Sequence, residues 1–326
     1  MHRSDSNRGR LNRRDFLAAP LAGALAVEAA AQRPIPIIDT HIHLFDPTRP
    51  GGVPWPPQTN ATLYKPALPP RYRGLAAPHG ITGAIEVECS PLVEDNQWVL
   101  DVAEKDTIMV GTVGNLEPGK PGFRAHLDRL TKNPLFRGIR WGTLWGRKFT
   151  EEIARPECIA DLKALAAAGR SLDSATAGAE LIAGLVRLTD RVPELRVIID
   201  HLPQFNPPAE AAPLKEYQAN LRELAKRPQV FVKGSEVLRR VDGKVIEDLA
   251  FYKPRLDELW GLFGDDRMIY GSDWPNSDNW APYDRVFRIV NLYIQGRGRE
   301  AAEKYFWRNS VRAYRWMKRH PSQPAA

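Results

Sequence analysis

From Arg33 onward, short apolar runs alternate with longer stretches in which apolar residues recur at helical spacing. This alternation is typical of βαβ units that build a parallel sheet. Eight runs are predicted strands: Ile35–Thr40, Thr82–Glu88, Ile108–Val113, Phe136–Arg140, Ser171–Asp173, Arg196–Ile199, Val230–Lys233 and Met268–Tyr270. The predicted helices are Asn96–Lys105, Phe123–Lys132, Cys158–Ala168, Ala179–Asp190, Leu214–Arg227, Pro254–Phe263, Tyr283–Tyr293 and a closing helix, Ala301–Met317. The pattern favours an α/β fold, a single-domain (β/α)8 TIM barrel over residues 32–326, rather than an open doubly wound sheet.

Two long connections, Pro47–Pro70 and Leu202–Pro213, follow predicted strand ends. Barrel enzymes place their sites at this end, so both segments are predicted lid or substrate loops. The first predicted strand is not followed by a Gly-x-Gly-x-x-Gly turn. This argues against a dinucleotide-binding fold and a nucleotide cofactor.

The clearest chemical signal lies at the end of the first predicted strand, where residues 37–43 read Ile-Ile-Asp-Thr-His-Ile-His. Because side chains alternate across a strand, we expect Asp39, His41 and His43 to share the interior face and the residues between them to face the helices. Two imidazoles at this spacing can converge on one metal ion or one substrate oxygen, whereas a single histidine at a strand end is more often structural. The pair is therefore interpreted as functional.

The last predicted strand leads into Gly-Ser-Asp-Trp-Pro at residues 271–275. The alternation aims Asp273 at the barrel mouth, where a carboxylate beside imidazoles can accept a proton from water or bind a metal. The alternative is a helix N-cap in this segment, a role that suits Ser272 or Asn276 better. Asp273 is therefore interpreted as catalytic or metal-liganding.

Residues on other strands are predicted to bind substrate. Arg140 would place a permanent positive charge near the mouth, unless it pairs with an acidic neighbour instead. Glu86 and Glu88 are expected to point inward from the second strand, Glu88 toward substrate and Glu86 toward Lys233. Weaker candidates for substrate contact are Trp141 and Asp173. The tryptophans that either stack on a sugar ring or only pack are Trp55, Trp145, Trp274 and Trp280.

Together, His41-x-His43 and the Gly-Ser-Asp-Trp-Pro run resemble the amidohydrolase superfamily. More narrowly, they resemble its amidohydrolase-related lactonases, such as the 2-pyrone-4,6-dicarboxylate and sugar-lactone hydrolases. Three further matches extend the resemblance from residue 35 to about residue 318: Gly138-Ile139-Arg140, Ile199-Asp200-His201 and Asn309-Ser310. The resemblance implies a barrel enzyme in which His201 is catalytic; the alternative for His201 is a bond to a loop carbonyl.

The chain departs from the metal-rich members of that superfamily. Binuclear amidohydrolases have a Lys or Glu on the fourth strand and a His on the fifth, where this chain has Arg140-Trp141 and Ser171–Ser174. We therefore expect a single divalent metal, such as zinc, or none, with metal-independent chemistry slightly favoured. The candidate ligands are His41, His43 and Asp273, with Glu88 or His201 as a fourth.

The predicted activity is hydrolysis of a sugar or carboxylated lactone, with Asp273 as the general base for an attacking water. The groups expected to stabilise the oxyanion are His41, His43, His201 and Arg140. The sequence contains no Gly-x-Ser-x-Gly motif, so a serine nucleophile has no support. Two alternatives stay open: a zinc-dependent decarboxylase of the same superfamily and a non-catalytic secreted carbohydrate-binding barrel.

Residues 1–31 resemble a twin-arginine signal peptide. Arg13-Arg14 precede the apolar run Phe16–Val27, and Ala29-Ala30-Ala31 forms a small-x-small cleavage site. The apolar run is shorter than the ~20 residues that span a membrane. The segment predicts an exported, periplasmic or secreted protein without stable membrane insertion after cleavage; the alternative is a chance amphipathic N-terminus.

The formal net charge of +7 does not change this picture, because much of it comes from arginines before residue 34. The chain has no basic stripe with interleaved aromatics, so we expect a small-molecule substrate and no nucleic acid. Cys89 and Cys158 form no Cys-x-x-Cys motif, and the sequence leaves open whether they pair. It also leaves the oligomeric state open.

Overall fold

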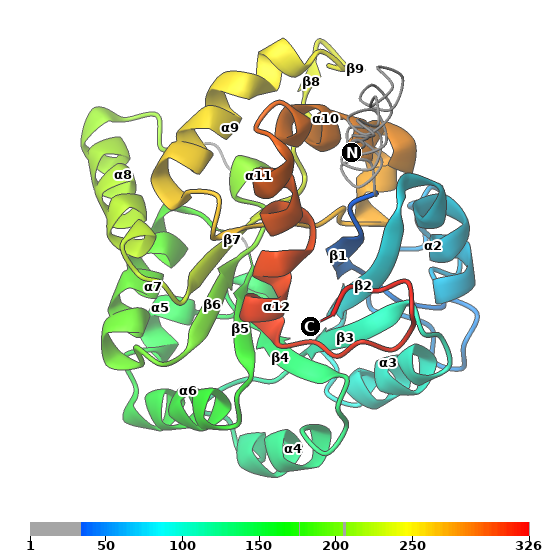
Figure 1. The fold of residues 1–326 in the computed structure, drawn as a ribbon. Coiled ribbons are helices and arrows are strands. Elements are labelled where there is room, and N and C mark those ends of the chain that lie inside the picture. Colours follow the sequence, from blue (N-terminus) through cyan, green and yellow to red (C-terminus); the bar gives the residue numbers. More distant parts are fainter. Residues whose placement is uncertain (1–33, 176, 205–206, 326) are drawn as a thin grey trace, which may run out of the picture. The chain divides into compact units, whose positions relative to one another are not determined.

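The computed structural model describes residues 34–175, 177–204 and 207–325, so the predicted signal peptide lies outside the described residues. Eight parallel strands run in chain order around a barrel, and helices cover its outside (Figure 1). The strands are β1 (Ile37–Ile42), β2 (Ile81–Val87), β3 (Met109–Gly114), β4 (Phe136–Arg140), β5 (Ser171–Ser174), β6 (Arg196–Ile199), β7 (Val230–Gly234) and β10 (Met268–Tyr270). The predicted (β/α)8 TIM barrel is confirmed.

The helices between and after the strands are α2 (Pro69–Ala76), α3 (Asp95–Glu104), α4 (Phe123–Leu130), α5 (Phe149–Glu152), α6 (Pro156–Ala167), α7 (Ala179–Arg191), α8 (Ala211–Ala225), α9 (Leu249–Phe263), α10 (Tyr283–Gln295), α11 (Arg299–Glu303) and α12 (Asn309–Tyr314). The predicted closing helix is divided, because a π-helical turn at Lys304–Arg308 separates α11 from α12. Helix α2 and a small hairpin of β8 (Arg240–Val241) and β9 (Lys244–Val245) were not predicted.

Each long helix covers the barrel with an apolar face. In α7, Leu181, Leu185 and Leu188 recur at helical spacing and are buried, whereas Arg187 and Asp190 are exposed. Burying one leucine stabilises a fold by about 1.5–3 kcal/mol. Tertiary packing of such faces therefore holds the helices in place more than their intrinsic propensity does.

The barrel closes between β1 and β10 through a few backbone hydrogen bonds at their carboxyl ends. The amide of Asp273 donates to the carbonyl of His41 (2.8 Å), and the amide of His43 donates to the carbonyl of Trp274 (2.7 Å). These bonds fix the two sequence motifs side by side.

The opposite end of the barrel is covered by the C-terminal segment, drawn red in Figure 1. Tyr314 and Trp316 pack into the same core cluster as Ile38. Arg319 donates to the carbonyl of Met109 (2.8 Å) and Gln323 donates to that of Thr82 (2.9 Å), both near strand starts. The carboxyl ends of the strands are therefore the end available for a site.

The predicted direction of Asp39 is wrong. Pairing between β1 and β2 is irregular between Asp39 and Ile42, so the alternation of side chains breaks there. The Asp39 carboxylate lies in the helix layer, where it accepts hydrogen bonds from the hydroxyls of Tyr72 (2.8 Å) and Tyr283 (3.2 Å). It does not share the face of His41.

The predicted direction of Glu86 is wrong as well. Ile85 and Val87 belong to the core cluster, so Glu86 lies on the other face of β2 and lines a cavity with Val99 of α3. It does not pair with Lys233. Neither of its carboxylate oxygens has a hydrogen-bond partner among the described residues, and burial raises its pKa well above the usual range, with the Glu88 charge adding to the shift.

Cys89 and Cys158 are both free thiols. Within the described part of the chain, every helix is too short or too polar to cross a bilayer.

Candidate active site

Three imidazoles surround one carboxylate oxygen at the carboxyl end of the barrel. Oδ1 of Asp273, after β10, lies 3.1 Å from Nε2 of His43 and 3.4 Å from Nε2 of His41. Nε2 of His201, after β6, lies 3.9 Å from the same oxygen. All four side chains are between 0% and 6% exposed. The structure thus brings together the four residues that the sequence proposed as catalytic.

The backbone at this site is strained. Asp273 (φ 60°), His201 (φ 55°) and Glu236 (φ 49°) adopt the left-handed conformation, which costs a residue other than glycine roughly 1–2 kcal/mol. All three follow the ends of barrel strands. Because such strain persists only where surrounding contacts enforce it, its concentration here supports a functional role.

The local contacts leave Asp273 free for chemistry. Ser272, not Asp273, provides the local side-chain turn, because its hydroxyl accepts from the amide of Trp274 (3.1 Å). The side-chain amide of Asn276 donates to Oδ2 of Asp273 (2.7 Å), leaving Oδ1 to face the imidazoles. Burial raises the pKa of Asp273, and hydrogen bonds from its neighbours oppose that shift.

The imidazoles are held in their neutral forms. Burial lowers the pKa of His43 to about 4, with the Arg140 charge adding to the shift, and burial lowers that of His201 to about 4. The pKa of His41 is lowered well below its usual value by burial and then by the charge of Lys233. Neutral imidazoles can bind a metal or exchange hydrogen bonds with water and substrate.

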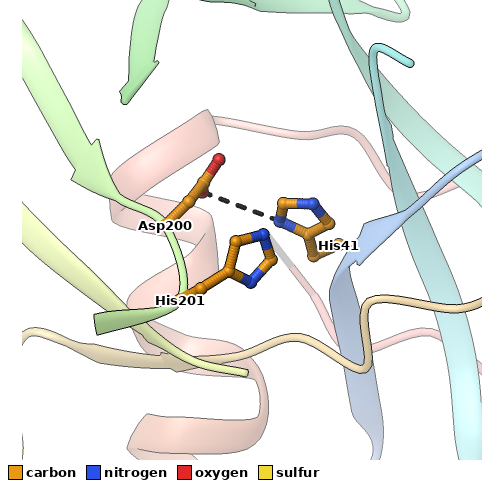
Figure 2. Close-up of side chains that lie close together, drawn as sticks. All are labelled: His41, Asp200 and His201. Atoms are coloured by element: carbon orange, nitrogen blue, oxygen red, sulfur yellow. Dashed lines mark ion pairs between the residues drawn. The ribbon is translucent and has the colours of Figure 1, made fainter. Parts of the chain in front are cut away.

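A buried charge cluster lies beneath the histidines. Nζ of Lys233, on β7, donates to Asp173 (2.6 Å), forms an ion pair with Asp200 (3.0 Å) and lies 3.1 Å from Nδ1 of His41. Figure 2 shows Asp200 and His201 facing His41, and the Asp200 carboxylate lies 3.6 Å from Nδ1 of His41. The sequence reasoning missed this cluster, although a lysine within the apolar strand Val230–Gly234 signals a buried, paired charge.

Arg140 forms the structural pair considered for it and also contacts the candidate catalytic residues. Its Nε donates to Asp200 (3.0 Å), as a structural pair would. Its Nη2 donates to Nε2 of His201 (3.3 Å), and its Nη1 donates to the carbonyl of Glu88 (3.4 Å). The guanidinium therefore borders the catalytic cluster while remaining tied to the buried charges.

Glu88 forms part of the wall beside the cluster. Its carboxylate accepts from the amide of Ser90 (3.0 Å) and from the indole N–H of Trp145 (3.3 Å). Trp141 does not reach the site. It follows Arg140 by one position, points outward, and is fully buried against Phe149, so the prediction that it contacts substrate is wrong.

Glu236 is a site residue that the sequence reasoning missed. Its carboxylate accepts from the side-chain amide of Asn276 (2.8 Å), which also binds Asp273. Burial raises its pKa to about 8; His201 opposes the shift and Asp273 adds to it. Its position just after the seventh barrel strand, at the same edge as the other site residues, is the signal that could have found it.

Two of the distances between the candidate ligand atoms fit a single divalent cation. Tetrahedral zinc with bonds of about 2.0–2.1 Å sets its ligand atoms ~3.3 Å apart. The distances from Oδ1 of Asp273 to Nε2 of His41 and of His43, 3.4 Å and 3.1 Å, match that value. Nε2 of His41 is buried and has no hydrogen-bond partner in the described part of the chain.

The tautomer of His41 decides between a metal ligand and a hydrogen-bond donor. If Nδ1 donates to Asp200, Nε2 has a lone pair for a cation. If Nδ1 accepts from Lys233, Nε2 carries the proton and donates. The Lys233 contact is the shorter one, 3.1 Å against 3.6 Å, which favours the donor form.

A comparison with known protein families decides the chain's membership. The family model described as amidohydrolase matches residues 38–316, which include all of the barrel strands from β2 onward and nearly all of β1. The chain belongs to the amidohydrolase family.

Relatives and solved structures agree with this membership. The L-fucono-1,5-lactonase of Burkholderia ambifaria is 29% identical to this amidohydrolase over 246 residues, covering 74% of this chain and 80% of that protein. An amidohydrolase from Burkholderia multivorans with bound zinc superposes with a TM-score of 0.74 at 21% identity, covering 86% of this chain and 100% of the other. A probable 2-pyrone-4,6-dicarboxylic acid hydrolase from Acinetobacter baumannii superposes with a TM-score of 0.66 at 16% identity, covering 85% and 98%. The two superpositions show a shared fold.

Proposed function

We propose that this amidohydrolase is a lactonase that opens a sugar or carboxylated lactone by attack of water. The observation that carries the proposal is the position of Asp273 Oδ1 among the Nε2 atoms of His41, His43 and His201. The relative named L-fucono-1,5-lactonase supports the choice of a sugar lactone, since the match covers most of both chains.

Two hydrogen-bond acceptors face each other in this cluster. Nδ1 of His43 donates to the carbonyl of Val87 (2.7 Å), so Nε2 of the neutral ring carries no proton. That nitrogen lies 3.1 Å from Oδ1 of Asp273. A water molecule at this point can donate one proton to each acceptor, and Asp273 takes its proton as the oxygen attacks the ester carbonyl. General-base catalysis of this kind contributes roughly 10²–10⁴-fold.

The developing oxyanion requires hydrogen-bond donors. Arg140 is permanently charged and borders the cluster, and His41 presents Nε2–H in the form that accepts from Lys233. A preorganised donor in a buried site is worth roughly 10²–10³-fold in rate. A divalent metal, if bound, would be held by His41, His43 and Asp273 and would polarise the carbonyl as a Lewis acid.

The test is a panel of lactones offered to the purified protein, including L-fucono-1,5-lactone, other sugar lactones and 2-pyrone-4,6-dicarboxylate. Hydrolysis releases acid, which a pH indicator follows, and mass spectrometry identifies the ring-opened product. We expect at least one sugar or carboxylated lactone to turn over. A protein that opens none of them under any metal condition is not a lactonase of this class.

The same assay separates the decarboxylase alternative. A decarboxylase releases carbon dioxide and consumes a carboxyl group, whereas a lactonase adds the elements of water and creates one. Carbon dioxide release from aromatic carboxylic acids, without turnover of lactones, would favour the decarboxylase.

A further inference from the structure

Trp145 holds an unusual position in the loop after β4. Its backbone is left-handed (φ 62°, ψ 26°), a conformation that costs a side chain bearing Cβ roughly 1–2 kcal/mol. The residue is 38% exposed, so packing against the core does not account for the strain. Backbone strain of this kind clusters at active sites and ligand-binding positions, so it points to a functional role for Trp145.

The indole is tied to the catalytic cluster through Glu88. Its N–H lies 3.3 Å and 3.4 Å from the two Glu88 carboxylate oxygens. The backbone carbonyl of Glu88 in turn accepts from Arg140, which also donates to His201. Trp145 is therefore linked to His201 through three contacts, by way of Glu88 and Arg140.

The other tryptophans considered as sugar platforms are used differently. Trp274 is fully buried, with the Arg71 guanidinium 5.0 Å from its ring centroid. The Arg240 guanidinium lies 5.3 Å from the centroid of Trp280. Trp55 packs its ring against His43, with centroids 5.6 Å apart. Among these residues, Trp145 is exposed and also donates a hydrogen bond to Glu88 in the wall of the site.

We propose that Trp145 determines substrate specificity by stacking on the ring of a polyhydroxylated lactone, with Glu88 accepting hydrogen bonds from its hydroxyls. The apolar C–H face of a saturated ring packs on an aromatic face. A carboxylate has about four acceptor positions, so Glu88 can bind hydroxyls while it holds the indole and the Ser90 amide. The inference rests on the proposed lactonase function and adds the residue that makes the enzyme prefer a hydroxylated lactone ring.

The test compares Trp145→Ala, Trp145→Gly and Trp145→Phe with wild type, and uses Trp280→Ala as the matched control. The first measurement is the ratio of kcat/KM for L-fucono-1,5-lactone to that for δ-valerolactone, which has the same ring size without hydroxyls. We expect this ratio to fall about three- to tenfold in the alanine and glycine variants, mainly through a higher KM. The phenylalanine variant should keep most of the ratio, and Trp280→Ala should keep all of it.

A second measurement needs no turnover. Titration calorimetry with L-fucose, a six-membered ring with hydroxyls and no ester, should show binding to wild type that weakens in Trp145→Ala and Trp145→Gly. Thermal unfolding adds a check on the strain: Trp145→Gly should melt about 1–3 °C above Trp145→Ala, because glycine adopts the left-handed conformation without strain.

The outcomes separate the two claims. An unchanged substrate ratio in Trp145→Ala, or no binding of L-fucose to wild type, overturns the specificity role. If L-fucose binds in a way that depends on Trp145 but the protein opens no lactone, the proposed reaction is overturned. The proposed binding of a sugar ring by Trp145 then still stands. A purely structural role is indicated if both variants melt lower than wild type with an unchanged ratio.

Discussion

At Asp273, the two carboxylate oxygens have different surroundings. Oδ2 is engaged by the amide of Asn276, and Oδ1 faces the Nε2 atoms of three neutral imidazoles. This division suits a base, because one oxygen anchors the group while the other remains open to water. It also suits a metal ligand, so the two roles require separate tests.

Asp273→Asn should lower kcat by roughly 10²–10⁴-fold while the melting temperature stays close to that of wild type. Asparagine is nearly isosteric and keeps an acceptor oxygen, but it cannot take a proton from water at neutral pH. Stopped-flow or indicator assays on the preferred lactone give the rate, and L-fucose binding gives a control for an intact site. Rates near wild type would show that Asp273 is structural.

Removal of metal should leave the rate within about twofold of the untreated protein, because the donor tautomer of His41 needs no cation to stabilise an oxyanion. The measurement is dialysis against a chelator, with metal content determined by mass spectrometry before and after. Loss of activity together with one equivalent of metal, and its recovery on adding zinc, would instead assign Nε2 of His41 to the metal.

Individual strands show what alternation along a sequence can and cannot predict. The predicted bounds of β4, β6 and β10 are those observed. The directions of Asp39 in β1 and Glu86 in β2 were predicted wrongly, since alternation alone does not show which face of a strand is interior. The irregular pairing after Asp39 then restores His41 to the interior, a change that only the neighbouring strand reveals.

Glu86, on the outer face of β2, makes the stability of that strand depend on pH. Burial raises its folded-state pKa above the unfolded value of 4.5. Above the unfolded pKa the unfolded chain releases this proton while the folded chain keeps it, so the free energy of unfolding falls as pH rises toward the folded pKa. Glu86→Gln removes this titrating group and keeps the shape of the side chain.

The free energy of unfolding of Glu86→Gln, relative to wild type, should therefore be constant below about pH 4 and rise above it by at most about 1.4 kcal/mol per pH unit. Urea denaturation of both proteins across that range measures the difference. A difference that does not vary with pH would mean that Glu86 titrates normally in the folded protein.

Strands β5, β6 and β7 are joined by the Lys233 ammonium, which bonds Asp173 and Asp200 in a fully buried position. Lys233→Met should destabilise the fold by about 3–5 kcal/mol, because it leaves buried carboxylates without their cation. Adding Asp173→Asn should recover part of the loss. Lys226→Met, which removes an exposed lysine paired with Glu223, is the matched control and should cost about 0–1 kcal/mol. Equal effects of the two lysine variants would contradict the cluster's role.

For the whole molecule, the order of strands around the barrel followed from their order along the chain, and the end that carries the site followed from the polar residues after them. The charge cluster could not be predicted from the sequence, because Lys233 and His41 are 192 positions apart and meet only once the barrel closes. The covering of the other barrel end by Trp316, Arg319 and Gln323 also depends on long-range contacts. Sequence patterns therefore located the site and its histidines better than the residues that orient them.

Residues 1–31, which resemble a twin-arginine signal peptide, bear on the cellular location of the enzyme. In the described part of the chain the first barrel strand begins at Ile37, and the site residues named above all follow Ile37 in the sequence. We propose that residues 1–31 direct export of the folded protein. Arg13→Lys/Arg14→Lys should leave the precursor in the cytoplasm of a host with a twin-arginine pathway, whereas wild type should appear processed outside it; fractionation and immunoblotting distinguish the two. Deletion of residues 1–31 should retain lactonase activity in the cytoplasm. Export of the double variant at the wild-type level would show that the arginine pair is not a targeting signal.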